Sequence, residues 1–477
     1  MMRDLSGHLA AQLAADRAAP AAVGDVTLTY QGLADRVDAL AGSLEGHVTA
    51  GDVVALDIRS PVLGLVASLA TDRLGAAYLP LDTAAPAGRQ RWVVENAAAR
   101  VVVHQTGPLA LEPRPVTATR PAWPLTDPGY VIYTSGTTGR PKGVHVPKRS
   151  LVERLDGLLQ LPGLRRGGSI LAMSPLSFDM SVVELHLPLA AGGTMVTVDP
   201  AARRDVDVFD RAVREHRPDV VQATPSFFRL MIASGWRGNP DVALWCGGEA
   251  LTDELANALH ERCGTLWNMY GPTEATVWAS ACRLAPGQPI SLGTDLPGTA
   301  VELVDQRGRV LTAAGAEGEI RISGAGIADG YLDATPTETA RFAHTATSRT
   351  YLTGDRARRA DDGSLTFVGR LDNQVKVRGH RVELGEVEST LESHPAVTEA
   401  VVVLVDQGDP DTTHLSAAVV TRGGVRVRDL RAWLAERLPA PMLPSTFQVA
   451  TALPRTSAGK LDRVMISKRL SAGERLS

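Results

Sequence analysis

A loop rich in glycine and hydroxyl side chains, placed directly after an apolar run, is the feature that most restricts the fold of this chain. The run Tyr130–Tyr133 is aromatic and β-branched, which predicts a β-strand. The next ten residues, Thr134–Gly143, contain three glycines, four hydroxyl side chains, one proline and two cations. Glycines let backbone N–H groups approach a polyphosphate, hydroxyls donate hydrogen bonds, and Lys142 carries a charge on a flexible stem. The stretch is therefore interpreted as a strand that ends in an anion-binding loop.

The same composition also fits an ordinary surface loop, so the order of the residues has to decide. A P-loop NTPase is excluded because Gly143 follows Lys142 where that motif requires Ser or Thr. The ordered string Tyr-Thr-Ser-Gly-Thr-Thr-Gly-x-Pro-Lys-Gly, which starts at Tyr133, resembles the phosphate loop of the adenylate-forming superfamily. That superfamily includes acyl- and aryl-CoA ligases, luciferases and the adenylation domains of nonribosomal peptide synthetases. The resemblance implies ATP-phosphate contacts from Thr134, Ser135, Gly136, Thr137, Thr138, Gly139 and Lys142.

Bulk properties exclude several classes of protein. A length of 477 residues favours two or three domains. The balance of 49 basic against 53 acidic residues, with a net charge of −4, gives no sign of a nucleic acid partner. Three cysteines without C-x-x-C spacing predict free thiols, and no apolar run is long enough to predict a membrane segment. A soluble protein of the cytoplasm is expected.

Alternation of helical and strand-like segments predicts an α/β fold. The helical patterns Leu5–Arg17 and Tyr30–Leu44 are followed by the β-branched runs Val53–Ile58 and Val101–His104. Strands separated by helices favour parallel sheets covered on both faces. Between Ile290 and Phe367, short strands alternate with turns, which predicts a small β-rich subdomain.

The C-terminal part of the chain predicts a small α+β lid after a hinge. The expected helices and strands there are Glu386–Ser393, Val427–Leu438, Ala400–Val405 and Ser416–Val420. The predicted domains are therefore an N-terminal core of residues 1–371, which binds ATP and the substrate, and a lid of residues 372–477. By resemblance, Asp372 is the hinge residue, and Gly379 permits close approach of an incoming thiol.

Loops at the ends of predicted strands resemble the nucleotide site of the superfamily, in agreement with the usual place of ligands in open α/β sheets. The resemblance implies that Tyr270 stacks on adenine, Asn268 reaches the exocyclic amine, Thr273 donates to phosphate and Glu274 holds Mg²⁺. Asp355 is the expected partner of the ribose hydroxyls. The full set of implied ATP contacts outside the phosphate loop is Gly248, Glu249, Ala250, Asn268, Tyr270, Gly271, Thr273, Asp355, Phe367 and Arg370.

Asp179 distinguishes the branches of the superfamily. An acidic residue in an apolar neighbourhood costs several kcal/mol unless a cation or donor meets it, and from composition alone a structural aspartate fits equally well. In amino-acid-activating domains, an aspartate in the Phe-Asp-x-Ser context pairs with the α-ammonium of the substrate, and Asp179 stands in that context. Ligases that activate acyl or aryl acids have no ammonium to meet and usually lack this aspartate.

The remaining pocket positions imply a very small substrate. Two Trp and two Met among them fill most of the volume that a substrate side chain occupies. The pattern Asp-x-x-Gln-x-Gly-Met-Val-Trp looks like the specificity code for glycine, from which Trp245 departs. Alanine, serine, cysteine, threonine and a small nonproteinogenic acid stay open. The implied pocket residues are Asp179, Met180, Val183, Gln222, Trp245, Gly247, Met269, Val277 and Trp278.

The combined expectation is an enzyme that joins a small amino acid to AMP. By resemblance, Lys460 bridges the substrate carboxylate and the α-phosphate, and the catalytic residues are Lys460, Thr273 and Glu274, with Mg²⁺ on Glu274. The expected acceptor is the phosphopantetheine thiol of a separate carrier protein, and a small MbtH-like helper protein stays open as a further partner. An acyl- or aryl-CoA ligase is the alternative enzyme. A catalytically dead binding module is disfavoured because Lys460, Glu274 and Asp355 are all present.

Overall fold

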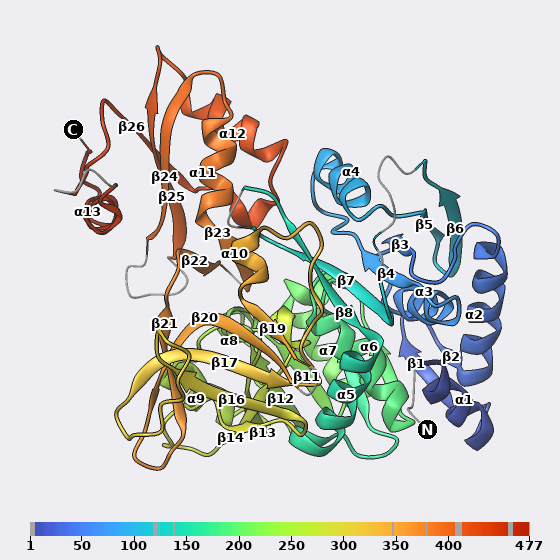
Figure 1. The fold of residues 1–477 in the computed structure, drawn as a ribbon. Coiled ribbons are helices and arrows are strands. Elements are labelled where there is room, and N and C mark those ends of the chain that lie inside the picture. The colour runs from blue at the N-terminus through green and yellow to red at the C-terminus, as the bar shows by residue number, and fades with distance from the viewer. Residues whose placement is uncertain are drawn as a thin grey trace. The chain divides into compact units, whose positions relative to one another are not determined.

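The computed structural model describes residues 5–117, 123, 125–136, 139–345, 348–377, 379–405, 413–456 and 461–476. It has a mixed α/β architecture, with a large N-terminal part built on sheets and a small C-terminal part (Figure 1), which confirms the predicted fold class. The chain forms two compact units. Unit 1 contains residues 1–83, 94–132 and 143–371, and unit 2 contains residues 84–93, 133–142 and 372–477. The functional division at residue 371 stays a prediction.

The largest sheet of unit 1 has nine strands. Its central strands are parallel, and antiparallel strands occur only toward its two edges. The strands are, in spatial order, β15 (Thr294–Asp295), β14 (Ser280–Leu284), β13 (Cys263–Tyr270), β12 (Asn239–Gly247), β11 (Val220–Ala223), β9 (Ser169–Ala172), β10 (Thr194–Thr197), β1 (Pro20–Gly24) and β2 (Leu28–Thr29). The parallel centre agrees with the strand and helix alternation of the sequence.

A second sheet of seven strands carries the predicted phosphate loop between two of its strands. Its order is β18 (Gly330–Tyr331), β8 (Lys142–Pro147), β7 (Pro128–Thr134), β4 (Ala77–Pro80), β3 (Val53–Asp57), β5 (Val101–Gly107) and β6 (Ala110–Pro115). Strand β7 contains the predicted strand Tyr130–Tyr133, so the loop follows its carboxyl end.

Helix α6 (Met180–Ala191) lies in the centre of the core. Eleven of its twelve residues are buried, and it packs against α1, α3 and α5 as well as strands β9, β10 and β11. A helix that is apolar on all sides is expected at such a place. The other helices of the N-terminal part are α1 (Leu5–Ala15), α2 (Tyr30–Leu44), α3 (Pro61–Arg73), α4 (Ala87–Asn96), α5 (Lys148–Leu158), α7 (Val206–His216), α8 (Pro225–Ala233), α9 (Asp253–His260) and α10 (Pro336–Thr339).

The predicted β-rich subdomain forms an antiparallel five-stranded sheet. Its strands are β16 (Thr299–Val304), β17 (Glu317–Gly324), β20 (Arg349–Arg359), β19 (Phe342–His344) and β21 (Leu365–Arg370). The C-terminal part of unit 2 contains β22 (Gln374–Val377), β23 (His380–Glu383), β24 (Val397–Val405), β25 (His414–Thr421), β26 (Thr446–Ala450), α11 (Leu384–Glu392), α12 (Val427–Ala435) and α13 (Arg463–Ser471). It has its own apolar core, which includes Val387, Leu391 and Val402.

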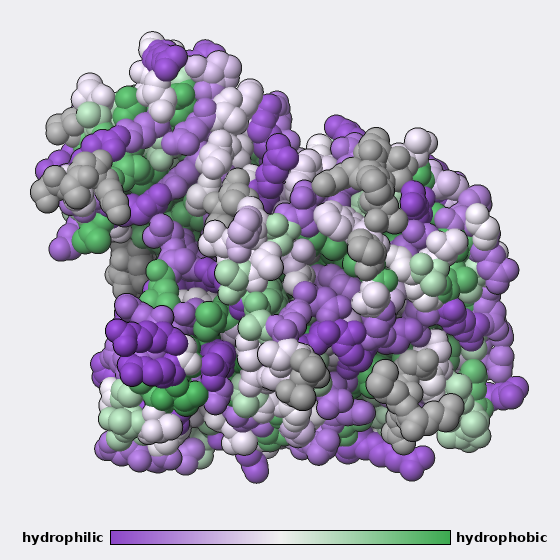
Figure 2. All heavy atoms as spheres, in the orientation of Figure 1, coloured by the Kyte–Doolittle hydropathy of each residue, from purple (hydrophilic) through white to green (hydrophobic). Residues whose placement is uncertain are grey.

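The surface agrees with the balanced charge of the sequence. Hydrophilic residues cover most of the face that Figure 2 shows, with smaller apolar areas between them. Within the part of the chain that the structure describes, no helix combines the length and the apolar character needed to cross a bilayer.

Candidate active site

Asp179 occupies the N-terminal end of the buried helix α6, where it is the N-cap residue. It is 7% exposed, and its Oδ2 accepts a hydrogen bond of 2.6 Å from the hydroxyl of Thr273. The positive end of the helix dipole favours a carboxylate at this position. Thr273 begins the short 3-10 helix η3 (Thr273–Ala275). Two residues that sequence analysis assigned to different parts of the substrates, the ammonium and a phosphate, are therefore direct neighbours.

The register of the large sheet places four predicted pocket residues on one face. Gln222 on β11 is opposite Trp245 on β12, and Gly247 on β12 is opposite Met269 on β13. Because side chains alternate along a strand, Trp245 and Gly247 point to the same face. This face packs on the apolar cluster that also contains Met180, Val183, Val277 and Trp278. The structure thus brings the predicted pocket residues together.

Two hydrogen bonds fix the side chain of Gln222, the polar residue among the predicted pocket residues. The indole Nε1 of Trp278 donates to Oε1 of Gln222 at 2.7 Å, and Nε2 of Gln222 donates to the carbonyl of Met180 at 3.0 Å. Both side chains are fully buried. Because the amide of Gln222 is held at both ends, the ring of Trp278 has one preferred orientation.

Glu184 supports the same residues from within α6. Its carboxylate accepts hydrogen bonds from the backbone N–H of Met173 (2.9 Å), from the N–H of Ser174 (2.8 Å) and from the Ser174 hydroxyl (2.6 Å). Nε2 of Gln222 lies 3.5 Å away. Burial is the main cause that raises the pKa of Glu184 from 4.5 to about 7, and the hydrogen bonds oppose it.

The backbone beside the pocket is strained. Thr276 and Val277 both have positive φ angles, 57° and 70°, which β-branched residues rarely adopt. The hydroxyl of Thr276 donates to the carbonyl of Gly326 at 2.6 Å, which helps to hold this conformation. A Cβ at Gly247 would lie 2.3 Å from the carbonyl of Met269 and 2.7 Å from the Trp278 ring, so only glycine fits there.

Glu274, the predicted metal ligand, is completely buried, and its Oε1 accepts a hydrogen bond of 2.6 Å from the Tyr331 hydroxyl. The Tyr331 hydroxyl is also 3.1 Å from the hydroxyl of Tyr351. The backbone of Glu274 is held as well, since its carbonyl accepts the N–H of Ala328 at 2.9 Å. The segment that follows residue 324 therefore orients both the main chain and the side chain of Glu274.

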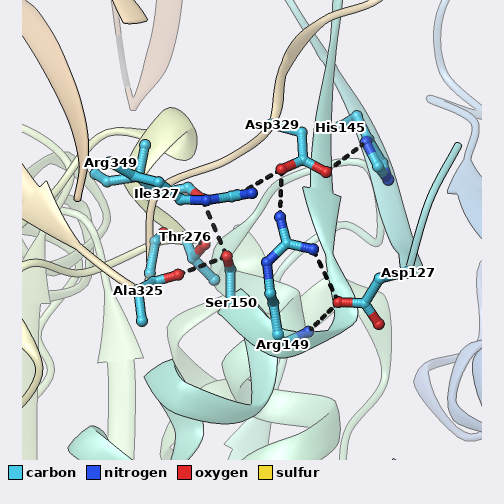
Figure 3. Close-up of polar contacts among 10 residues, drawn as sticks. Asp127, His145, Arg149, Ser150, Thr276, Ala325, Ile327, Asp329 and Arg349 are labelled. Atoms are coloured by element: carbon cyan, nitrogen blue, oxygen red, sulfur yellow. Dashed lines mark hydrogen bonds and ion pairs between the residues drawn. The ribbon is translucent and has the colours of Figure 1, made fainter. Parts of the chain in front are cut away.

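An ion-pair network holds that segment in place (Figure 3). Asp329 lies between the guanidinium groups of Arg149 and Arg349, at 2.5 Å from each, and 3.5 Å from Nδ1 of His145. Arg149 also pairs with Asp127 at 3.1 Å. Burial lowers the pKa of His145 to about 4, so the two arginines carry the positive charge that meets Asp329 at neutral pH.

Ser150 and Arg154 on α5 complete the support of the loop that contains Glu274. The Ser150 hydroxyl lies within hydrogen-bond distance of the carbonyls of Ala325 (2.6 Å) and Ile327 (3.0 Å) (Figure 3). Arg154, which is 2% exposed, donates to the carbonyl of Ala275 at 3.2 Å. Burial lowers the pKa of Arg154 to about 10, so the guanidinium remains a cation directly behind η3.

Tyr270, predicted to stack on adenine, Asp355, predicted to bind ribose, and Arg370, predicted to contact ribose or phosphate, are joined by hydrogen bonds. The hydroxyl of Tyr270 donates to Oδ2 of Asp355 at 2.8 Å, and the guanidinium of Arg370 binds the other carboxylate oxygen. Asp355 and Arg370 are opposite each other on β20 and β21. Burial is the main cause that raises the pKa of Tyr270 well above 10, and the Asp355 charge adds to it. The phenol is therefore a donor at neutral pH.

Asn268 is oriented by the backbone. Its Nδ2 donates to the carbonyl of Ser291 at 2.8 Å, which orients the amide, and its contact with an exocyclic amine stays a prediction. The carboxylate of Glu249 accepts the N–H (2.9 Å) and hydroxyl (2.7 Å) of Ser226 at the start of α8, and its contact with ATP stays a prediction. The other predicted contacts lie on loops or strands of unit 1: Gly248 (φ 85°), exposed Ala250, Gly271, and Phe367 on β21.

In unit 2, the predicted phosphate loop contacts residues that follow the predicted hinge. The hydroxyl of Ser135 donates to the carbonyl of Arg381 at 2.9 Å, and the N–H of Gly136 donates to Oε2 of Glu386 at 3.1 Å. Gly139 has a φ of 83°, and Thr134 and Lys142 end β7 and begin β8. Thr137 and Thr138 lie outside the described residues.

The predicted hinge and lid residues are partly described. Oδ1 of Asp372 accepts a hydrogen bond of 3.2 Å from the N–H of Gln374, the first residue of β22. Gly379 has a φ of 85° between β22 and β23, a conformation that glycine adopts readily. Lys460, the predicted catalytic lysine, lies outside the described residues.

Comparison with known proteins decides the family. The model described as "AMP-binding enzyme" matches residues 9–332, and the model described as "AMP-binding enzyme C-terminal domain" matches residues 386–460. The chain belongs to the AMP-binding enzyme family. Its relatives include nonribosomal peptide synthetases, and one similar solved structure contains an adenylation domain, so the chain is an ATP-dependent, AMP-forming ligase.

The relatives of this AMP-binding enzyme are much longer proteins. Phosphinothricin tripeptide synthetase PhsC of Streptomyces viridochromogenes is 36% identical over 478 residues, which cover 92% of this chain and 42% of that protein. Tyrocidine synthase 3 of Brevibacillus parabrevis is 34% identical over 466 residues, which cover 92% of this chain and 7% of that protein. The chain thus spans less than half the length of these curated relatives.

Two solved structures are similar over almost the entire chain. A four-domain nonribosomal peptide synthetase, holo-AB3403, bound to AMP and glycine, has a TM-score of 0.70 and 33% identity, covering 97% of this chain and 36% of that one. Holo-PA1221, which contains adenylation and PCP domains and is bound to a vinylsulfonamide inhibitor, has a TM-score of 0.83 and 25% identity, covering 98% of this chain and 84% of that one.

Glu274 is the residue predicted to hold a metal ion in this AMP-binding enzyme. Among the residues that the structure describes, no three Asp, Glu, His or Cys side chains gather as a ligand set. The fit of Mg²⁺ therefore rests on Glu274, a buried carboxylate that Tyr331 orients at 2.6 Å. One carboxylate together with substrate phosphates is a common way to bind Mg²⁺, so the residues present are compatible with it.

Sequence reasoning missed the residues that orient the predicted site residues. Glu184 has a recognisable signal, because it is an acid inside a long apolar run, where an unpaired carboxylate is too costly. Tyr331, Arg89 and Glu386 have no local signal. Their partners are 57, 297 and 250 residues away in the chain, so only the fold reveals them.

Proposed function

We propose that this AMP-binding enzyme activates glycine with ATP, forms glycyl-AMP and pyrophosphate, and transfers the glycyl group to the phosphopantetheine thiol of a separate carrier protein. The observation that carries the proposal is a buried carboxylate, Asp179, at the edge of a cluster of bulky buried side chains. A buried carboxylate attracts the ammonium group of an amino acid. The bulky residues of the cluster are Met180, Trp245, Met269, Val277 and Trp278.

Steric exclusion is the physical reason for choosing glycine. Trp245 and Trp278 are at most 1% exposed, and Trp278 is fixed by its hydrogen bond to Gln222. Adding even one methylene to well-packed surroundings costs about 1 to 3 kcal/mol. A pocket that large side chains already fill thus selects against every amino acid with a longer side chain. The similar four-domain synthetase that was crystallised with AMP and glycine supports this choice.

The proposed chemistry requires orientation and charge stabilisation from the protein. A carboxylate becomes a good acyl donor when it attacks the α-phosphate of ATP and pyrophosphate leaves. In the proposal, Thr273 donates to phosphate, Asn268 and Tyr270 bind adenine, Asp355 binds ribose, and Arg370 contacts ribose or phosphate. The loop residues 134–143 bind the departing pyrophosphate. Bound Mg²⁺ would neutralise phosphate charge at Glu274.

The lid residues complete the proposal. Lys460 is proposed to bridge the substrate carboxylate and the α-phosphate, and rotation about Asp372 then withdraws it so that the thiol approaches past Gly379. Such a gating step often limits turnover. A relative that contains both adenylation and PCP domains supports a carrier protein as the partner. The proposed location is the cytoplasm, where ATP is available.

Amino-acid-dependent exchange of pyrophosphate into ATP tests the proposal. The panel contains the proteinogenic amino acids, β-alanine, aryl acids and short fatty acids, each with and without an MbtH-like helper protein. A dominant glycine signal is expected. Exchange with a larger amino acid keeps the adenylation of amino acids but refutes the pocket assignment. Exchange only with acids that lack an amine refutes the role of Asp179 and favours an acyl- or aryl-CoA ligase.

A Lys460→Ala variant separates the two half-reactions. Adenylate formation is expected to fall by about two orders of magnitude or more, because the developing charge loses its cation. Transfer from preformed glycyl-AMP to the carrier is expected to change much less, as measured by the loading of a carrier protein. An equal loss in both steps would refute the proposed role of Lys460.

A further inference from the structure

Three segments that are distant in the sequence meet at one carboxylate within unit 2. Glu386, in the first turn of α11, is fully buried. Its Oε1 accepts a hydrogen bond of 2.6 Å from the Arg89 guanidinium on α4, and its Oε2 accepts the N–H of Gly136 at 3.1 Å. Arg89 is itself largely buried, with 14% of its side chain exposed. The Arg89 guanidinium and the N–H of Gly136 therefore form an anion-binding site, and the Glu386 carboxylate of the same chain occupies it.

The donors of this site suit a phosphate oxygen as well as a carboxylate. A guanidinium and a backbone amide that converge from two elements are typical of phosphate recognition. Gly136 belongs to the loop that we propose to bind pyrophosphate. The hydroxyl of Ser135, the neighbouring donor, is also used by the C-terminal residues, since it donates to the carbonyl of Arg381 at 2.9 Å. Carboxylate and carbonyl oxygens of the C-terminal segment thus occupy two donors of the loop.

The loop backbone packs closely on α11, the helix that carries Glu386, and both donors are already used by its carboxylate. A Cβ added to Gly139 would lie 2.8 Å from the Cβ of Ser389 on α11. A Cβ added to Gly136 would lie 1.8 Å from the carbonyl oxygen of Arg140, so the turn itself is also tightly closed. Pyrophosphate and Glu386 therefore cannot bind the same two donors at the same time.

We propose that Arg89 and the N–H of Gly136 are ligands of pyrophosphate, and that Glu386 is an internal competitor that takes their place when pyrophosphate leaves. This inference rests on the proposed function and adds Arg89 to its phosphate-binding residues. A competitor that is part of the chain is always present at the site. Its effect is to lower the apparent affinity for pyrophosphate and to oppose the reverse reaction, in which pyrophosphate attacks the adenylate.

Binding of inorganic pyrophosphate to the full chain, measured by isothermal titration calorimetry, tests the proposal. The variant E386A should bind pyrophosphate at least about tenfold more tightly than the unmodified chain, because the competing charge-assisted hydrogen bonds are gone. E386Q, which retains an acceptor without the charge, should lie between the two. Unchanged or weaker binding by both variants would overturn the role of Glu386.

A matched control separates competition from a general charge effect. Glu392 is on the same helix, and its carboxylate accepts the N–H of Ala400 at 3.2 Å, away from the loop. E392A removes the same charge, so its affinity for pyrophosphate should stay within about twofold of that of the unmodified chain. A gain in E392A equal to that in E386A would refute competition at the Arg89 and Gly136 donors.

The role of Arg89 is tested without its competitor. In the E386A background, the additional change R89A should weaken pyrophosphate binding by about tenfold, because a bound phosphate loses its guanidinium. If Arg89 served only to hold Glu386, R89A would have no effect in that background, and its role as a ligand would be refuted. Trp92, whose ring lies 6.1 Å from that of Tyr133 beside the loop, provides a fluorescence readout of the same titrations.

The outcome can be distinguished from failure of the proposed function. Amino-acid-dependent exchange by the unmodified chain tests adenylation by itself. If exchange occurs and the pyrophosphate affinities do not follow the expected order, only the inference fails. If exchange is absent for every acid, the proposed function fails, whereas the direct binding measurements still decide whether Glu386 and Arg89 compete for and bind pyrophosphate.

Discussion

The substitution Glu184→Gln tests whether burial or hydrogen bonding has the larger effect on the pKa of Glu184. Glu184 lies inside the core with its carboxylate bound by the N–H groups of Met173 and Ser174 and by the Ser174 hydroxyl. Two effects oppose each other there. Burial disfavours the charged form, and the three donors favour it. Because burial is the larger effect, the carboxyl is expected to retain its proton to unusually high pH.

The magnitude follows from the difference between the folded and unfolded pKa values. Burial raises the pKa of Glu184 from 4.5 to about 7. Between these values the folded chain holds a proton that the unfolded chain has lost, so the free energy of unfolding falls as pH rises through this range. Below pH 4.5 both states are protonated, and above pH 7 both are charged. At 1.36 kcal/mol per pH unit, the total loss is about 3 kcal/mol.

Urea unfolding of the unmodified chain and of E184Q, measured from pH 4.5 to pH 8, isolates this titration. Glutamine does not titrate, and all other groups are shared, so the difference between the two unfolding free energies reports Glu184 alone. Tryptophan fluorescence is a suitable signal, because Trp245, Trp267 and Trp278 surround this part of unit 1. The stability advantage of the unmodified chain over E184Q should shrink by about 3 kcal/mol toward pH 8.

If the difference in unfolding free energy between the two proteins does not change with pH, the argument that burial dominates the pKa of Glu184 is refuted. A difference that grows toward pH 8 would refute it more strongly, because the hydrogen bonds to the ionised carboxylate would then outweigh its desolvation. The test depends on the slope and not on the absolute loss of stability. Any loss of packing in E184Q is the same at every pH and cancels.

Three further predictions concern the proposed reaction. Asp179→Asn should lower kcat/KM for glycine about 100-fold in the exchange assay through the loss of a buried charge pair, while ATP binding measured by calorimetry stays within about twofold; unchanged glycine kinetics would remove the ammonium assignment. Tyr331→Phe removes the donor to Glu274, so the Mg²⁺ concentration for half-maximal exchange should rise at least about tenfold. An unaltered Mg²⁺ dependence would contradict a metal at Glu274. Trp278→Phe leaves the oxygen of Gln222 without its donor, so the free energy of unfolding should fall by about 1 to 3 kcal/mol, and alanine should become a better substrate relative to glycine; an unchanged alanine-to-glycine ratio would refute exclusion by this ring.

Local patterns were sufficient to predict most of the fold. The helix at Tyr30–Leu44 has the predicted bounds, and the strand that leads to the phosphate loop contains the predicted run Tyr130–Tyr133. Both follow from the spacing of apolar side chains, which is written directly in the sequence. The order of strands in the large sheet could not be predicted in this way, because β11 pairs with β9, and β9 with β10. Such neighbours depend on how crossovers pack, and no local pattern specifies them.

The same distinction explains which parts of the candidate site were foreseen. Motif resemblance selected Asp179, Gln222 and Trp278 as predicted ligand contacts, without showing that Gln222 and Trp278 bind each other. The sheet register places Gln222 beside Trp245, and the chain between η3 and β14 brings the indole N–H of Trp278 to the oxygen of Gln222. A buried Trp needs such an acceptor, and a buried amide needs such a donor. The pair therefore satisfies itself inside the core, and the identity of either residue alone does not reveal that geometry.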